Sequence, residues 1–361
     1  VEVYGIENIT QVIEYFDQNK TLKLTNIDVS VEFNRSIEFQ EYDFSDVKGQ
    51  DSIKRCMEIA AAGGHNIILI GPPGAGKTML AKRLPSILPP MTLDEALETT
   101  KIHSVVGRIT ANTGLITQRP FRSPHHTISN VALVGGGSYP RPGEISLSHN
   151  GVLFLDELPE FKREVLEVMR QPLEDREVTI SRARFTVTYP SSFMLVASMN
   201  PSPSGFFIDS DSALMSSRAE MQRYMSRISG PLLDRIDIHI EVTPVPFEKL
   251  SEDRKGESSH IIRARVIKAR TIQNTRFKEQ SIHYNAQMSS KHIRAFCHLN
   301  TSAKTVLKSA MDRLNLSARA YDRILKVSRT IADLEQERDI TEVHITEAIQ
   351  YRSLDREGWL G

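Results

Sequence analysis

Residues 66–78 read NIILIGPPGAGKT, an apolar segment that runs directly into a glycine-rich turn. The apolar residues 67–70 are mostly β-branched and predict a buried strand. The residues that follow, Gly71–Thr78, match the pattern G-x-x-x-x-G-K-[ST] in full. A chance match in a chain of this length is roughly a one-in-a-hundred event at average residue frequencies. A coincidental glycine-rich turn is therefore the weaker interpretation.

A turn of this kind binds phosphate groups with its backbone. Its glycines let N–H groups point inward at the start of the next helix, which we predict from Lys77 to about Leu88. Lys77 is expected to reach the terminal phosphates, and Thr78 is expected to hold Mg²⁺. The residues predicted to contact the nucleotide are Gly71, Pro72, Pro73, Gly74, Ala75, Gly76, Lys77, Thr78 and Met79.

A second apolar run ends in two adjacent carboxylates. In NGVLFLDELPEF (150–161), residues 152–155 predict a buried strand, and Asp156 and Glu157 follow it. A phosphate-binding loop needs a neighbouring strand that ends in an aspartate, which helps to position Mg²⁺. Asp156 fits that role, and Glu157 can orient and polarise the attacking water. The alternative is a solvated pair that caps the helix predicted near residue 160.

The rest of the chain alternates between strands and helices up to about residue 250. A helix is predicted over 51–62, strands at FMLVASMN and RIDIHIEV, and a hairpin within REVTISRARFTVTYP. A long irregular segment is predicted between the helix after Lys77 and the strand before Asp156. This alternation predicts an α/β fold with a parallel sheet covered on both faces. Helices are then predicted at about 258–276, 289–298, 301–314, 318–334 and 341–352.

Composition narrows the class of protein. The 361 residues are 40% hydrophobic and 25% charged, which is typical of globular proteins, and the formal net charge is zero. Any nucleic-acid surface must therefore be a local patch. Cys56 and Cys297 lie far apart, which argues against a disulfide framework. With no long apolar run and no signal-peptide pattern, a cytoplasmic location and no membrane partner are expected. The start at Val1 suggests a fragment.

Taken together, these motifs resemble AAA+ ATPases, and more closely the magnesium-chelatase-like ComM/YifB group. The resemblance runs from about Asp43 to the C-terminus, through GPPGAGKTMLAKRLPSILPP, RPFRSPHHTIS, GGGSYPRPGEISLSHNGVLFLDELPEF, SRISGPLLDRIDIHIEV and LSARAYDRILKVSRTIADL. It implies a P-loop core with a five-stranded parallel sheet over 43–247, and a small all-helical lid over 248–361. It also implies a homo-hexameric ring with ATP and Mg²⁺ between neighbouring subunits.

The resemblance assigns three further residues to catalysis. Asn200 is similar to the sensor residue that helps to hold the attacking water. Arg235, in LLDRID, resembles the arginine finger offered to the next subunit's ATP, and Arg319, in SARAYDR, resembles the sensor arginine of the lid. The alternatives are a strand-terminating turn residue for Asn200, and surface ion pairs with Asp234 or Asp322 for the arginines.

The sequence departs from its relatives at two places. Many relatives carry a Lon-protease-like domain before the core, whereas residues 1–42 resemble only its tail or linker, without an assignable protease pair. Many also have cysteines, similar to a zinc site, where this chain has Ser202 and Ser204, and near Leu214 and Ser216. Serine hydroxyls are poor zinc ligands, so no structural zinc is expected.

The resemblance implies a DNA motor for branch migration of recombination intermediates. Two basic stretches offer modest support. Residues 101–150 contain one acid and five basic residues, Lys101, Arg108, Arg119, Arg122 and Arg141, and residues 261–278 contain six basic residues and no acid. For the first stretch, loops that serve subunit contacts or ATP are an equal alternative, and for the second a solvated helix face is the favoured one. The rival function is a chelatase-type chaperone that remodels a protein without DNA. A third, a binding module with an inactive ATPase, conflicts with the complete set of catalytic residues.

The hairpin carries the most specific DNA candidates, Arg182 and Arg184. Related ring helicases point such a hairpin into the pore, where positive charge engages the backbone without reading sequence. Stacking on bases is not expected, because only Phe185 and Tyr189 lie nearby. His125 and His126 have no acid or cysteine at ligand spacing, so a structural or phosphate-facing role is favoured over metal binding.

Overall fold

The structure is a computed structural model of the whole chain. It describes residues 3–18, 21–22, 24, 33, 42–109, 114–182, 185–202, 220, 223–246 and 256–355. The chain divides into two compact units, Val1–Phe39 and Gln40–Gly361. In the first unit, helix α1 (Ile9–Phe16) starts at Asn8, whose side-chain oxygen accepts a hydrogen bond from the Gln11 N–H at 3.1 Å. The predicted boundaries at 42/43 and 247/248 stay predictions.

The second unit contains the sheet and most of the helices. Its helices are α3 (Asp51–Gly63), α4 (Lys77–Ile87), α5 (Leu93–Val105), α6 (Asn130–Val134), α7 (Glu144–Leu147), α8 (Arg163–Glu167), α9 (Arg170–Asp175), α11 (Gly230–Leu233), α13 (Ser259–Arg276), α14 (Ser290–Phe296), α15 (Thr301–Arg313), α16 (Ala318–Leu334) and α17 (Glu342–Gln350). Its strands are β1 (Ile67–Ile70), β2 (Phe121–Arg122), β3 (Gly135–Gly136), β4 (Arg141–Pro142), β5 (Val152–Leu155), β6 (Glu177–Ser181), β7 (Thr186–Pro190), β8 (Met194–Met199) and β9 (Ile238–Glu241).

Five strands form one sheet in the order β2-β5-β8-β1-β9, and every neighbouring pair is parallel. The central strands β1, β5 and β8 are buried along their whole length. Strands buried on both faces are continuously apolar, which is why their sequences do not alternate. The structure thus confirms the predicted α/β class with a parallel five-stranded sheet and a following all-helical part.

Successive side chains along each strand enter two different apolar clusters. In β1, Ile67 and Leu69 join the cluster that contains α3, α4 and α13, whereas Ile68 and Ile70 join the cluster formed with α8 and the residues around α11. This alternation follows from the two-residue period of a strand. The two clusters are therefore the two faces of the sheet.

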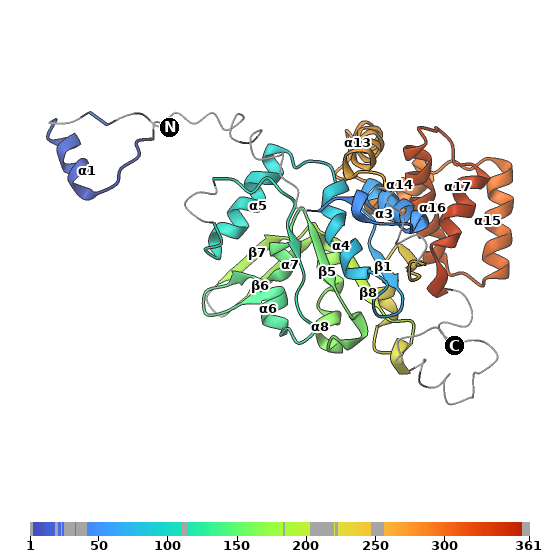
Figure 1. Cartoon of the computed structure of the whole chain (residues 1–361). Helices are drawn as coiled ribbons and strands as arrows, with labels where there is room; N and C mark the ends of the chain where they lie inside the picture. Colours follow the sequence, from blue (N-terminus) through green and yellow to red (C-terminus); the bar gives the residue numbers. More distant parts are fainter. Residues whose placement is uncertain are drawn as a thin grey trace. The chain divides into compact units, whose positions relative to one another are not determined.

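The C-terminal helices pack against the back of the first of these clusters. Figure 1 shows α14–α17 grouped beside α3 and α13. Buried residues of α13, α16 and α17 belong to the same apolar cluster as residues of α3 and α4, so one continuous core runs through both parts. Polar contacts add to it: Arg55 on α3 pairs with Glu347 on α17 at 3.0 Å, and His65 contacts Thr330 on α16 at 2.8 Å.

The prediction of a long irregular segment after Leu88 is wrong, because the segment contains α5. Thr92 and Glu95 form a capping box: the Thr92 hydroxyl accepts from the Glu95 N–H at 3.2 Å, and the Glu95 carboxylate accepts from the Thr92 N–H at 2.9 Å. Such a pair stabilises a helix start by satisfying two backbone donors. The segment also supplies the edge strand β2.

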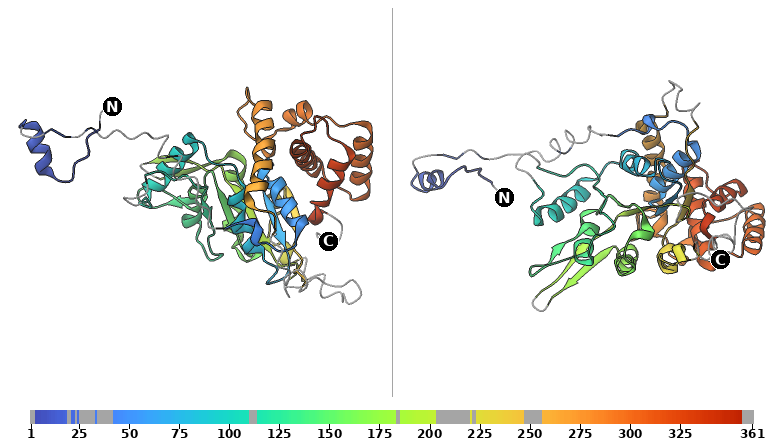
Figure 2. Two further views of the ribbon diagram at one scale, coloured as in Figure 1. Left: turned by 45° about the horizontal axis from the view of Figure 1, so that its top comes forward. Right: turned by 60° about the horizontal axis from the view of Figure 1, so that its bottom comes forward.

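Two antiparallel hairpins, β3–β4 and β6–β7, complete the unit. The second is the predicted hairpin; at its turn the Arg182 N–H donates to the Phe185 carbonyl at 2.8 Å. The hairpins are linked where the Tyr189 hydroxyl donates to the Pro140 carbonyl at 2.8 Å. Figure 2 shows the β6–β7 hairpin extending away from the sheet. Within the described ranges, no helix has both the length and the apolar character to cross a membrane.

Candidate nucleotide site

The glycine-rich loop joins β1 to α4, and its glycines have specific structural reasons. Gly74 and Gly76 adopt positive φ angles of 77° and 88°, which side-chain-bearing residues rarely do. A Cβ atom on Gly71 would lie 2.2 Å from the Val242 carbonyl oxygen, so only glycine fits there. Because the loop ends at the N-terminus of an 11-residue helix, the N–H groups at this helix start are suited to an anion.

Lys77 lies inside this loop. Its ammonium donates to the carbonyls of Gly71 at 2.5 Å and Pro72 at 3.0 Å, and to the Asn200 side-chain oxygen at 3.1 Å. All three donor hydrogens therefore have acceptors. Burial lowers the pKa of Lys77, although nearby carboxylates act in the opposite direction. Phosphate oxygens are stronger acceptors for this charge than carbonyls, so the arrangement is ready to exchange them.

Asp156 accepts two hydroxyl hydrogen bonds at the end of β5. One comes from Thr78 at 2.8 Å and the other, a short one, from Ser198 on β8. The contact with Ser198 follows from strand register, since Leu155 lies opposite Ala197 and the next pair is Asp156 and Ser198. The loop, β5 and β8 thus bring a hydroxyl and a carboxylate to one point. Such hard oxygen ligands suit Mg²⁺.

Glu157 has an unusual backbone for a residue with a side chain, with φ 56° and ψ 51°. Its N–H donates to the Ser198 hydroxyl at 3.2 Å, which holds this left-handed turn. The turn directs the carboxylate into solvent, where the side chain is 57% exposed. The His126 ring nitrogen Nδ1 lies 3.7 Å from the Glu157 carboxylate. The His126 ring is tilted by 35° against that of His125, with centroids 4.0 Å apart, and it contacts Phe161 edge-on.

The structure thus brings five of the predicted residues to one edge of the sheet, the carboxyl ends of parallel strands where ligands of α/β proteins bind. They are Lys77, Thr78, Asp156, Glu157 and Asn200. Met79 lies in the first turn of α4 and packs against the apolar core, 3.3 Å from where a Gly76 Cβ would be. The roles predicted for these residues stay predictions.

Arg235 lies at the opposite edge. Its carbonyl accepts from the Asn66 side chain at 2.9 Å, and Asn66 directly precedes β1, whereas Gly71 directly follows it. The strand between them has four residues, a span of about 13 Å at the usual rise. The Arg235 guanidinium donates to the Pro231 carbonyl at 2.7 Å and makes a short ion pair with Glu174. The contacts of this guanidinium are thus with residues outside its own glycine-rich loop.

Arg319 lies at this same opposite edge. It forms a short ion pair with Asp234, the residue before Arg235, and its side chain is 72% exposed. One turn further along α16, Arg323 donates to the Asp234 carbonyl at 3.1 Å and pairs with the buried Asp237 at 3.0 Å. The sequence offered Asp234 and Asp322 as alternative partners, and Asp234 is the partner of Arg319. Helix α16 thus holds the segment that carries Arg235.

The basic stretches proposed for DNA are largely used inside the chain. In the first, Arg108 and Arg122 pair with Glu144, at 3.5 Å and 2.5 Å, and Arg119 pairs with Glu95 at 3.1 Å. In the second, Arg265 pairs with acids, the partly buried Arg270 lies over the Tyr284 ring and Arg276 pairs with Asp333. Arg182 is exposed at the hairpin turn, whereas Arg184 lies outside the described residues.

Among the residues that the structure describes, no group of three or more His, Cys, Asp or Glu side chains has the arrangement of a metal site. In the described part of the chain, His125 and His126 belong to no such group, and their role stays a prediction. Ser202 is buried, and Ser204, Leu214 and Ser216 lie outside the described residues. The expectation of no structural zinc stays a prediction.

Sequence reasoning missed several residues around the site. Ser198 was hidden within an apolar strand and became visible only through its pairing with β5. Gln50 is another: with φ 53°, it donates from its side chain to the carbonyls of Ala75 at 3.2 Å and Thr243 at 3.0 Å. It thereby ties the glycine-rich loop to the end of β9. Its position directly after Gly49, before α3, was the only signal.

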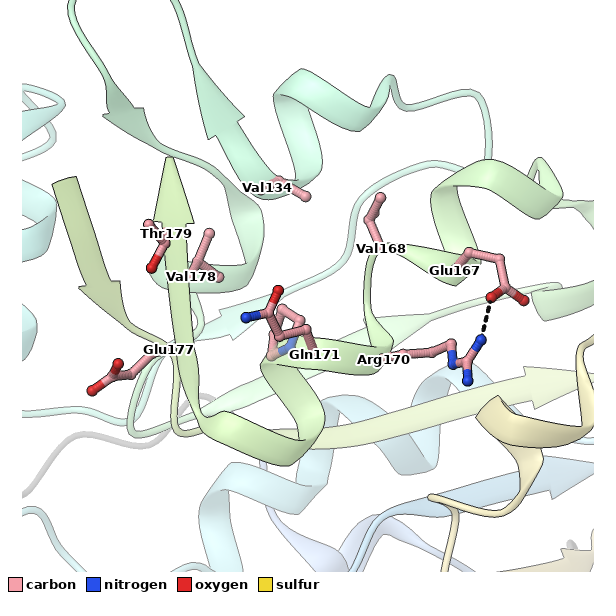
Figure 3. Close-up of a pocket in the computed structure, with 9 residues that line it drawn as sticks. Val134, Glu167, Val168, Arg170, Gln171, Glu177, Val178 and Thr179 are labelled. Carbon is pink, nitrogen blue, oxygen red and sulfur yellow. Dashed lines mark hydrogen bonds and ion pairs between the residues drawn. The ribbon is translucent and has the colours of Figure 1, made fainter. Parts of the chain in front are cut away.

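A hollow of about 380 Å³ lies elsewhere, between β6 and helices α8 and α9 (Figure 3). At its rim Glu167 accepts a hydrogen bond from Arg170 at 2.8 Å. Its lining residues are Val134, Glu167, Val168, Arg170, Gln171, Pro172, Glu177, Val178 and Thr179. None of them belongs to the glycine-rich loop or the carboxylate pair, so this hollow is separate from the nucleotide site.

Comparison with known proteins gives matches along the chain. A family model described as Magnesium chelatase, subunit ChlI, matches residues 43–250, and one described as its C-terminal part matches 256–352. Competence protein ComM of Haemophilus influenzae is 46% identical over 354 residues, 98% of this chain and 68% of that protein. The uncharacterized protein YifB of Escherichia coli is 48% identical over 317 residues, 88% of this chain and 61% of that protein.

A more distant relative is the uncharacterized protein Rv2897c of Mycobacterium tuberculosis, 39% identical over 337 residues, 92% of this chain and 65% of that protein. The chain spans 61–68% of the length of these three relatives. The first family model covers the part that contains the sheet, and the second covers the C-terminal helices. The chain therefore belongs to the magnesium-chelatase-like AAA+ ATPases, in the group that includes ComM and YifB.

Proposed function

We propose that this chain hydrolyses ATP with Mg²⁺ and, as a ring of six copies, uses the energy to move DNA and promote branch migration of recombination intermediates. The separation of catalytic groups on two edges of the sheet carries the proposal. One edge has the groups that would hold a nucleotide, and the opposite edge has the two arginines. A second copy is needed to bring both sets to one nucleotide.

On the nucleotide edge, each residue has a distinct task. The loop N–H groups and Lys77 bind the β- and γ-phosphates, and Thr78 and Asp156 hold Mg²⁺. The bound Mg²⁺ neutralises charge that develops on the phosphate oxygens. Glu157 accepts a hydrogen bond from the attacking water and aligns it with the γ-phosphate, and Asn200 donates its amide hydrogens to the same water or phosphate.

On the opposite edge, Arg235 is proposed as the finger for the neighbour's ATP, and Arg319 as a second arginine on that same ATP. Support comes from their shared location and from the ion pairs with Glu174 and Asp234 that hold them without a neighbour. A ring is the assembly that uses such a head-to-tail contact repeatedly without leaving a free end. Arginine charge delivered in this way lowers the barrier to phosphoryl transfer.

The DNA part of the proposal depends on the name of the ComM relative and on the charged hairpin. "Competence protein" is the printed description of that relative. The rival, a chaperone that remodels a protein, is favoured by the magnesium chelatase name of both family models. The two functions share the nucleotide site and differ in what the ring grips.

The test is steady-state ATP hydrolysis by the chain alone and with single-stranded, duplex and four-way-junction DNA. The Glu157→Gln variant, which keeps the size of the side chain and removes its charge, should bind ATP and lose hydrolysis. A rate increase that is largest with junctions supports branch migration. A basal rate that no DNA changes, together with no DNA binding at low salt, would refute the DNA motor and favour the protein-remodelling chaperone.

A further inference from the structure

The turns of the two hairpins lie against each other, although about 45 residues of sequence separate them. A Cβ atom on Gly136 of β3 would lie 2.8 Å from the Arg182 guanidinium, so that side chain lies over the glycine backbone. The Tyr189–Pro140 hydrogen bond described above links the same two hairpins. The two turns therefore form one surface, which we call the paired tip.

Two aromatic rings meet on the paired tip. Tyr139, from the β3–β4 turn, and Phe185, from the β6–β7 turn, have ring centroids 6.2 Å apart and planes at 35°. Tyr139 is 76% exposed and Phe185 46% exposed. Tyr189, by contrast, is half-buried, and burial raises the pKa of its hydroxyl. The apolar surface of this aromatic pair is thus exposed to solvent, so packing in the core does not explain the two rings.

The charge around these rings has one sign. Residues 135–142 and 178–189 contain three arginines, Arg141, Arg182 and Arg184, and no aspartate or glutamate. Arg141 and Arg182 are exposed, and no carboxylate in the described ranges pairs with either of them. This differs from the basic stretches of the core, whose arginines are mostly paired within the chain. The paired tip can therefore accept an anionic partner without first breaking an ion pair.

We propose that the paired tip binds single-stranded nucleic acid, with bases stacked on Tyr139 and Phe185 and phosphates contacted by Arg141 and Arg182. Single-stranded nucleic acid offers exposed bases, which stack on aromatic rings, and phosphates, which contact unpaired positive charge. A duplex hides its base faces, so the proposal is specific for unpaired strands. It rests on the proposed function and adds the feature of DNA that the motor would grip.

Stacking also predicts little sequence preference, because every base offers a π-face. The proposal departs from the sequence analysis, which expected no stacking because only Phe185 and Tyr189 lie near the hairpin in sequence. In the structure, the ring beside Phe185 is not the half-buried Tyr189 but Tyr139, which comes from the other hairpin. An apolar peptide is a weaker candidate, because it has no negative charge to contact the arginines.

The experiment measures fluorescence anisotropy of labelled oligothymidine and of an abasic oligomer of the same length, titrated with the chain at low salt. The abasic strand keeps the phosphates and removes the stacking surface. The parent chain should bind oligothymidine more tightly. The Tyr139→Ala/Phe185→Ala variant should lose about tenfold to a hundredfold in affinity per ring for oligothymidine and little for the abasic strand.

Three further variants separate the parts of the surface. Tyr139→Phe/Phe185→Tyr keeps both rings and should restore binding. Arg182→Gln should weaken both strands alike and reduce the salt dependence, as loss of a phosphate contact does. Tyr321→Ala removes an aromatic residue on the lid that is 38% exposed, and should change nothing. Basal ATP hydrolysis without DNA should be unchanged in the alanine double variant, which shows that it folds.

The outcomes distinguish this proposal from the proposed function. If DNA raises ATP hydrolysis by the parent but the double variant binds oligothymidine normally, the motor stands and the paired tip is wrong. Equal affinity of the parent for both strands would also overturn stacking. If the parent binds no DNA, both proposals fail.

Discussion

The exchange of Ser198 for alanine tests the catalytic geometry most directly. Ser198 is fully buried on β8, and its hydroxyl serves two groups at once: it donates to Asp156 and accepts from the Glu157 N–H. Removing it leaves a carboxylate proposed to hold Mg²⁺ and a strained backbone turn without their shared partner. Because Ser198 is fully buried on the middle strand of the sheet, water cannot readily replace its hydroxyl.

The size of the effect follows from the bonds lost. A hydrogen bond to a charged group contributes about 1.5–3 kcal/mol, and a neutral one about 1 kcal/mol. If only the charged bond matters for alignment of the water and Mg²⁺, the rate should fall about tenfold to a hundredfold. The effect should appear mainly in kcat and in a higher Mg²⁺ requirement. ATP binding should change little, because the hydrogen bonds of the Ser198 hydroxyl go to Asp156 and Glu157, outside the glycine-rich loop.

The assay is ATP hydrolysis over a range of Mg²⁺ concentrations, with nucleotide affinity measured separately by a fluorescent ATP analogue. Ser191→Ala is a matched control, since Ser191 is also buried and its hydroxyl has no partner in the described part of the chain. Ser198→Thr retains the hydroxyl and should be nearer to the parent. If Ser198→Ala keeps kcat within twofold and the Mg²⁺ dependence is unchanged, the reasoning is refuted.

Two other predictions concern subunit contacts and pH. Arg235→Ala should lose about a thousandfold or more in kcat and still bind ATP. Mixing it with Glu157→Gln subunits should restore activity, because random mixing in equal amounts leaves about one site in four with both residues intact. Mixtures that stay inactive would mean that Arg235 acts within its own chain. Burial lowers the pKa of His65 and of His239, so the unfolded chain takes up protons near pH 6.5 that the folded chain does not. The stability present above that pH should therefore fall as pH falls, by no more than about 1.4 kcal/mol per histidine at pH 5.5. Thermal unfolding scans measure this, and His239→Leu should flatten the slope.

The glycine-rich loop and the carboxylate pair could be predicted from sequence because their chemistry requires particular residues at consecutive positions. Gly71–Thr78 lie on one turn, and Asp156 and Glu157 follow a continuously apolar strand. The number of strands in the sheet came from the resemblance to a family, and their order was not predicted. Helix α5 was missed, although Thr92 and Glu95 carry a local signal for its start, because its apolar residues recur with only weak helical periodicity.

Features that depend on contacts between distant segments could not be predicted. Ser198 supports Asp156 only because two strands pair in one register, and nothing within either strand specifies that register. The location of Arg319 beside the segment of Arg235 follows from how α16 packs on the core. Tyr139 and Phe185 come from hairpins that look unrelated in sequence. Each of these is set by tertiary packing, which short motifs do not encode.

The apolar cluster that runs without interruption from the sheet into the C-terminal helices has a consequence for how the chain unfolds. Two parts that share one core gain little from melting separately, since either part alone would expose the face that the other covers. The region 43–352 should therefore lose its structure in one cooperative transition, despite being matched by two family models. Expression of the sheet-containing part alone would leave α3 and α4 with an uncovered apolar face, and aggregation is the expected result.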